Sequence, residues 1–113
     1  LQELRKWHEA NQFRLFDGMT ARLIAETLLA QPTPNVDEAQ RWLTKAVHAD
    51  RSNGLKLALA HDYACFADLH RTNGDRRQAL SNLTHARDLF AECGAPGFVE
   101  EMDRRIELEA HSS

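Results

Sequence analysis

Apolar residues recur at three- and four-residue spacing along most of this chain, which is the pattern of helices with one buried side. The spacing predicts helices over about residues 2–12, 17–31, 35–53, 55–72, 76–92 and 95–110. Strand signals are absent from the sequence, since β-branched residues never alternate over a sustained run. We therefore expect an all-α chain of six helices joined by short turns.

Residues with a defined conformational role mark the ends of these helices. Pro32, the first of two nearby prolines, cannot donate a backbone amide and stops the second helix. Asn35 and Asp75 each precede a Glu or Gln by three residues, which is the arrangement of a capping box. Gly54 and Gly94 follow helix ends, where glycine tolerates the left-handed turn. Three antiparallel helix pairs, staggered by one helix, follow from this order.

The apolar pattern also repeats after forty residues. The series Ala39, Leu43, Ala46, Gly54 returns as Ala79, Leu83, Ala86, Gly94. A fixed period between about 20 and 50 residues is typical of helical-repeat arrays, whose units bury their apolar faces against one another. We expect one such domain, in which residues 1–13 form the trailing helix of an incomplete upstream unit, 17–53 and 55–93 form repeat units, and 95–110 form a charged capping helix. We also expect the chain to be a fragment of a longer protein.

Composition narrows the classes of function. Hydrophobic residues make up 42% of the 113 residues and charged residues 27%, which is typical of an ordinary globular chain. The net charge of −3 offers no broad attraction for nucleic acid or for an anionic membrane. No apolar run approaches the length of about 18 residues that indicates a membrane span. Two cysteines without metal or redox spacing favour a reduced, cytoplasmic protein.

One segment carries a more specific pattern. Its positions are Tyr63, Phe66, Ala67, His70, Gly74, Ala79, Leu83 and Ala86. This segment resembles a tetratricopeptide repeat, and residues 19–110 are similar to that family more loosely. His70 replaces the usual aromatic residue and Ala91 the usual closing proline. Residues 88–96 are similar to the repeat regions at the C-terminal end of large bacterial regulators and signalling ATPases. The resemblance implies a short right-handed solenoid of helical hairpins.

The resemblance also implies a concave groove lined by the first helix of each pair. On this sequence the groove positions are Met19, Arg22, Glu26, Leu29, His61, Ala64, Asp68 and Arg71. Mixed charge beside apolar side chains suits a peptide or helix, because pockets supply affinity while charges fix the register. We expect a non-catalytic module for protein–protein interaction in a bacterial regulatory or signalling protein. Reversal of Arg22 and Arg71 to glutamate is expected to weaken partner binding without unfolding the chain.

Other interpretations stay open at this point. The chain could sense a small molecule between its helix pairs, or it could be an architectural or dimerisation segment without a groove ligand. His61, Cys65 and Asp68 share one helical face and could hold a metal ion, but a fourth ligand is not evident. The sequence shows neither a nucleophile motif nor a glycine-rich phosphate loop, so we expect neither catalysis nor a cofactor.

The N-terminal edge raises a separate hypothesis about self-association. Leu4 and Trp7 lie on the apolar side of the first expected helix, which has no partner helix of its own in this chain. Either an upstream repeat of a longer protein or a second copy of the chain would cover that side.

Overall fold

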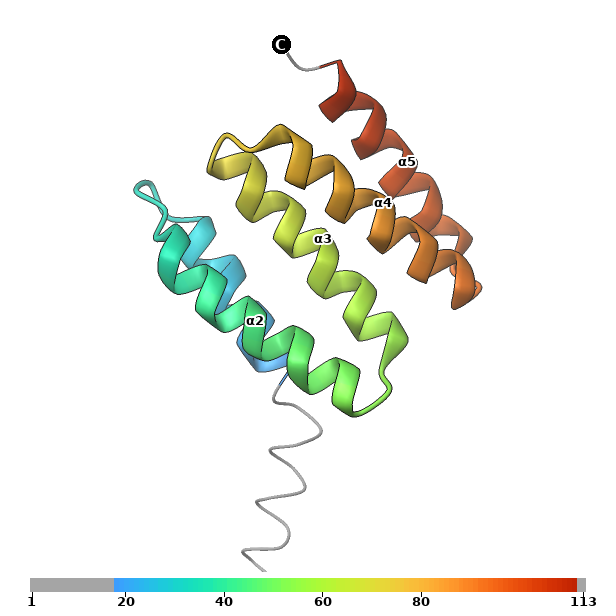
Figure 1. The fold of residues 1–113 in the computed structure, drawn as a ribbon, viewed down its shortest axis with the longest axis horizontal. Coiled ribbons are helices and arrows are strands. Elements are labelled where there is room, and N and C mark those ends of the chain that lie inside the picture. Colours follow the sequence, from blue (N-terminus) through green and yellow to red (C-terminus); the bar gives the residue numbers. More distant parts are fainter. Residues whose placement is uncertain (1–17, 112–113) are drawn as a thin grey trace, which may run out of the picture.

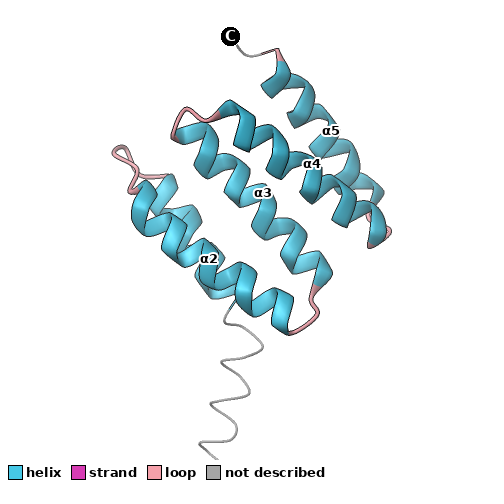
Figure 2. Cartoon of the chain, in the orientation of Figure 1, coloured by secondary structure: helices cyan, strands magenta, loops and turns pink. Residues whose placement is uncertain are grey.

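Five helices joined by short turns make up the part of the chain that the computed structural model describes, residues 18–111 (Figure 1). They are residues 18–29, α2 (Val36–Ser52), α3 (Lys56–Thr72), α4 (Arg76–Glu92) and α5 (Pro96–Ala110). Within residues 18–111 there is no strand (Figure 2), so the all-α prediction is confirmed there. Six helices were expected. The missing one, over residues 2–12, lies outside the described residues, as does the proposed self-association edge.

Three turns of one design connect α2 to α5. Gly54, Gly74 and Gly94 have φ angles of 68°, 77° and 67°, in the left-handed region that favours glycine. In each turn the amide after the glycine donates to the carbonyl five residues earlier, at 2.9, 2.8 and 3.0 Å. The turn geometry therefore recurs every twenty residues, twice within each forty-residue period of the sequence.

The helix starts repeat in the same way. The side chain of Asn35 accepts a hydrogen bond from the amide of Glu38 at 3.2 Å, and that of Asp75 accepts one from Gln78 at 3.1 Å. These bonds satisfy amides that have no partner within the helix and fix where α2 and α4 begin. The small-large-small positions of both helices are buried, namely Ala39, Leu43, Ala46, Ala79, Leu83 and Ala86. Helix packing is therefore consistent with a helical repeat.

Helix α3 contributes to two separate core clusters. One cluster joins helix 18–29, α2 and α3, and contains Ala25, Ala39, Leu43, Cys65 and Leu69. The other joins α3, α4 and α5, and contains Ala60, Ala64, Ala67, Leu83, Ala86, Leu89, Phe90 and Met102. Helix α3 is therefore buried on more than one side. Leu55 and Leu57 are nevertheless exposed, because they lie at its N-terminal end beyond both clusters.

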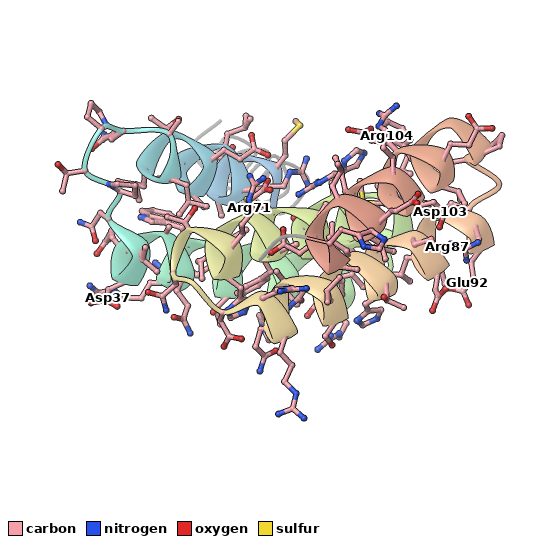
Figure 3. The ribbon with its side chains drawn as sticks, turned by 90° about the horizontal axis from the view of Figure 1, so that it is seen from above. Asp37, Arg71, Arg87, Glu92, Asp103 and Arg104 are labelled. Carbon is pink, nitrogen blue, oxygen red and sulfur yellow. The ribbon has the colours of Figure 1, made fainter. Side chains whose placement is uncertain are left out.

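The helices form two layers. In Figure 1, α2, α3, α4 and α5 follow one another from lower left to upper right, and helix 18–29 lies behind α2. Helix 18–29 and α5 both contact α3, through the ion pairs Arg22–Asp62 and Arg105–Asp68. Figure 3 shows these two helices on either side of the upper edge of the molecule. The first helix of each pair therefore lies on a common side, as the repeat pattern predicts.

Candidate partner-binding face

The surface shared by helix 18–29, α3 and α5 contains most of the predicted groove positions. We call it the first-helix face and define it by Met19, Glu26, Leu57, His61, Asp68, Arg71, Phe98 and Arg105. The α3 members stand three, four or seven residues apart, so their side chains share one side of that helix. Phe98 and Arg105 of α5 reach them through a ring contact with His61 and an ion pair with Asp68.

One end of the first-helix face is apolar. Met19, Leu57 and Phe98 are large side chains that remain 43%, 46% and 39% exposed. The imidazole of His61 lies edge-on to the rings of Phe98 and Phe90, with both pairs of centroids 4.9 Å apart. Burial and the nearby Arg22 guanidinium lower the pKa of His61, while Glu101 opposes this. His61 is thus an uncharged ring near neutral pH and extends the apolar surface.

The other end of the face is charged. Asp68 of α3 pairs with Arg105 of α5 and with Arg71 one turn further along its own helix, at 3.3 Å. The Arg71 side chain is 61% exposed and lies between helix 18–29 and α5 in Figure 3. Glu26 adds a half-exposed carboxylate from the opposite wall. A partner lying along the face would therefore meet apolar side chains at one end and charges of both signs at the other.

Arg22 is not free to meet a partner. Its Nη1 donates to Asp62 Oδ1 at 2.9 Å and to the carbonyl of Ala58 at 3.1 Å, and its side chain is only 12% exposed. Asp62 is fully buried. Arg22 therefore fastens helix 18–29 to α3. A glutamate at this position would face a buried carboxyl, so the double reversal of Arg22 and Arg71 would not test binding separately from folding.

A second buried carboxyl lies beside this pair. Asp50 of α2 is 2% exposed and lies near enough to Asp62 to affect the pKa of that carboxyl. Burial, followed by the hydrogen bond and charge of Asp50, raises the pKa of Asp62 to about 8, although Arg22 opposes this. Asp50 also presses against helix 18–29, because a Cβ added at Gly18 would lie 2.1 Å from Asp50 Oδ1. Neither aspartate was predicted to have a role from the sequence.

The remaining predicted groove residues serve packing. Leu29 packs against the core cluster of helix 18–29, α2 and α3. Ala64 is a member of the cluster of α3, α4 and α5. Conversely, Leu57, Phe98 and Arg105 belong to the face but were not among the predicted positions. Leu57 could have been found from its four-residue spacing to His61, whereas the two α5 residues depend on how that helix docks.

The three residues considered as metal ligands do not converge. His61 contacts the aromatic rings of α4 and α5, whereas Cys65 belongs to the cluster formed with helix 18–29 and α2. Burial, then the negative charges of Glu26 and Asp68, raise the pKa of Cys65 to about 12, so it remains a thiol. Across residues 18–111, no three His, Cys, Asp or Glu side chains are grouped so that they could hold a metal ion.

Two hollows lie away from the apolar end of the face. One of about 50 Å³ lies between α3, α4 and α5, beside Arg71 and Arg105. Small-molecule sites usually measure about 300–1,000 Å³, so it is too small for one. The other, of about 710 Å³, runs along α2, and its lining within the described chain comes from that helix alone: Asp37, Glu38, Gln40, Arg41, Trp42, Thr44 and Lys45. Among residues 18–111, no second helix contributes a wall to this hollow.

Comparison with known proteins adds no assignment, because no family model, curated protein or solved structure matches this chain. Of the helices described here, none combines the length and the apolar character needed to cross a bilayer.

Proposed function

We propose that this chain is a tetratricopeptide-like right-handed array that binds a peptide or helix of a partner protein on its first-helix face, without catalysing a reaction. The observation that carries this proposal is that the face has an apolar end and a charged end. Exposed Met19, Leu57 and Phe98 lie at one end, and Asp68, Arg71 and Arg105 lie at the other. The forty-residue period in caps, turns and buried positions supports the repeat architecture.

Each end of the face has a separate task in binding. An apolar side chain of the partner, placed against Leu57 and Phe98, would be removed from water. Such burial contributes about 1.5–3 kcal/mol to the binding free energy for a fully buried large side chain. The charged end would orient the partner, because a wrong charge placed there is repelled. Phe98 is held by stacking on Phe90 at 4.8 Å. This pre-ordering lowers the entropy that binding must remove.

We place this binding in a cytoplasmic bacterial regulatory or signalling protein, on the basis of the similarity of residues 88–96 to the repeat regions of such proteins. The alternative of small-molecule sensing has less support. The hollow between α3, α4 and α5 measures about 50 Å³, which is well below the size of a typical ligand site.

Selection from a random peptide display library tests the proposal directly. Peptides enriched on the full chain would be measured by fluorescence anisotropy against two variants. Arg71→Glu reverses an exposed charge of the face, and Leu57→Ala removes an exposed apolar side chain. Each is expected to weaken binding by about tenfold, which corresponds to 1.4 kcal/mol. Both positions are well exposed, so the fold should be retained.

Arg77→Glu is the matched control. It makes the same charge reversal at an exposed position in the first turn of α4, which belongs to the other layer of helices. Its affinity should stay within about twofold of the natural chain. Equal binding by all variants would show that the peptides do not bind at the first-helix face. Failure to enrich any peptide, together with self-association in sedimentation experiments, would instead favour the architectural or dimerisation alternative.

A further inference from the structure

Beneath the first-helix face, two carboxyl groups and one guanidinium meet where three helices pack. Arg22 comes from helix 18–29, Asp50 from α2 and Asp62 from α3. Asp50 and Asp62 are 2% and 0% exposed, so water does not solvate either carboxyl. The group sits at a tight contact, because the Gly18 backbone lies directly against the Asp50 carboxyl. Helix 18–29 therefore docks onto α2 and α3 partly through these charges.

The count of charges and of hydrogen-bond donors does not balance if both aspartates are ionised. Within residues 18–111, one guanidinium then faces two carboxylates, which leaves one negative charge in the interior. An uncompensated buried ion strongly destabilises the folded state. In addition, the Oδ2 atoms of Asp50 and Asp62 are buried and receive no hydrogen bond from a donor group. A protonated carboxyl is itself a donor, so one proton held between the two groups would neutralise the cluster and satisfy both oxygens.

We propose that Asp50 and Asp62 share one proton, and that this proton holds helix 18–29 against α2 and α3. The docking of the helix is then proton-linked. Removal of the proton leaves a buried negative charge that Arg22 alone does not offset, and the contact of helix 18–29 with the rest of the array weakens. This device is independent of what the first-helix face binds.

The charged and titratable groups around the pair define the pH range. Helix 18–29 contributes Arg22, with Glu26 at 3.9 Å from its Nε. Helix α2 contributes Asp50 itself. Helix α3 contributes His61 and Cys65, which neighbour Asp62 in the sequence. The pKa of Cys65, raised to about 12, keeps the thiol protonated throughout this range, and the lowered pKa of His61 confines its titration to the acidic side of 6.5.

The sign of the pH dependence follows from the pair. The pKa of Asp62 is about 8 in the folded chain against an ordinary value of 3.8. Between these values the folded chain holds a proton that the unfolded chain releases. The stabilisation is therefore complete below pH 3.8 and is lost progressively as the pH rises through 8. Beyond that the carboxyl is ionised in both states, so the dependence levels off.

The most direct test follows the carboxyl carbon of Asp62 in the full chain by NMR during a pH titration. The proposal predicts a midpoint near 8. A midpoint in the usual range for a solvated aspartate, about 4, would mean that no proton is retained and would overturn it.

A pair of variants tests the link to folding. Asp50→Asn supplies an amide donor to Asp62 and removes one negative charge, so a shared proton is no longer needed. Asp88→Asn makes the same change on an exposed side chain of α4 and serves as the control. Urea denaturation between pH 7 and pH 9 should show the folding constant fall about tenfold for the natural chain and the control. For Asp50→Asn the fall should be less than about twofold.

A tenfold fall in Asp50→Asn as well would assign the pH dependence to another group and overturn the proposal. An absent fall in the natural chain would do the same. If Asp50→Asn does not fold, the NMR midpoint of the natural chain still decides whether the proton is present.

Discussion

Two junctions in this molecule occupy matching places in the repeat but differ in chemistry. The first junction joins helix 18–29, α2 and α3 around Arg22, Asp50 and Asp62. The second junction joins α3, α4 and α5 around Ala64, Phe90 and Met102. Asp50 stands forty residues before Phe90, and Asp62 stands forty before Met102. One backbone arrangement thus accommodates a charged cluster in one place and an apolar cluster in the other.

The stability of the second junction is expected to be independent of pH, whereas that of the first junction depends on pH. Phe90 and Met102 are 0% and 2% exposed, and Phe90 also contacts the rings of His61 and Phe98. Their contribution comes from apolar burial, which does not depend on the pH. The carboxyls of the first junction are equally buried, yet their contribution to stability depends on whether the Asp50–Asp62 pair holds its proton. The docking of helix 18–29 is therefore expected to depend on the pH, unlike that of α5.

Truncation of Phe90 should have the largest effect. Phe90→Ala removes a fully buried ring from the centre of the second junction. Such a change typically costs about 3–5 kcal/mol of unfolding free energy, from lost burial and the cavity left behind. Urea denaturation at several pH values should show the same loss at each. A loss that varied strongly with pH would contradict the apolar account of this junction.

Removal of Arg22 should have an effect of similar size at pH 7 but should differ in its pH dependence. Arg22→Ala leaves Asp62 without its cation, and breaking a buried ion pair typically costs about 3–5 kcal/mol. At pH 4 the carboxyls can take up protons, so the loss there should be clearly smaller than at pH 7. The same denaturation series provides the measurement. Equal losses at both pH values would mean that Arg22 acts by packing alone.

A smaller effect is expected at Gly18. In Gly18→Ala the new methyl group would meet the Asp50 carboxyl at 2.1 Å, so the side chain or the helix must shift. Overpacking of this kind typically costs about 1–3 kcal/mol. Gly97→Ala in α5 is the control, because a Cβ there meets open space. The control should change stability by less than about 1 kcal/mol, in the stabilising direction. If both variants behave alike, the close contact is not a constraint.

The smallest change is expected for the surface ion pair that joins α3 to α5. Arg105→Ala removes the partner of Asp68 across the second junction, at side chains that are partly exposed. Exposed pairs contribute up to about 1 kcal/mol and are weakened by salt. Denaturation of the variant and the natural chain should differ at low salt and converge at high salt. A persistent large difference would show that Arg105 contributes mainly through its packing.

The sequence predicts the regular parts of this fold because local rules determine them. Caps at Asn35 and Asp75 and turns at Gly54 and Gly94 act within a few residues, so their positions can be found without knowing what packs against them. The buried small-large-small positions follow from helical spacing in the same way. The described end of helix 18–29 falls two residues before the expected 31, where the chain turns toward its prolines.

The candidate site was only partly predictable. Arg22 was expected to face a partner, because its helical position matches that of Ala64 and other groove residues. Its actual contact is with Asp62, forty residues away, and depends on how two helices dock. The sequence contains one signal for Asp50, since a charged residue stands where the repeat forty residues later has Phe90. Phe98 and Arg105 joined the face through tertiary packing that spacing alone does not specify.

Amide hydrogen exchange at pH 6 and pH 8 tests the difference between the two junctions most directly. After correction for the intrinsic exchange rates, protection of the amides in helix 18–29 should fall by more than about tenfold over this range. Protection of the amides in α5, which belongs to the second junction, should stay nearly constant. A parallel fall in both helices, or no fall in either, would contradict the account of a proton-linked first junction beside an unconditional second one.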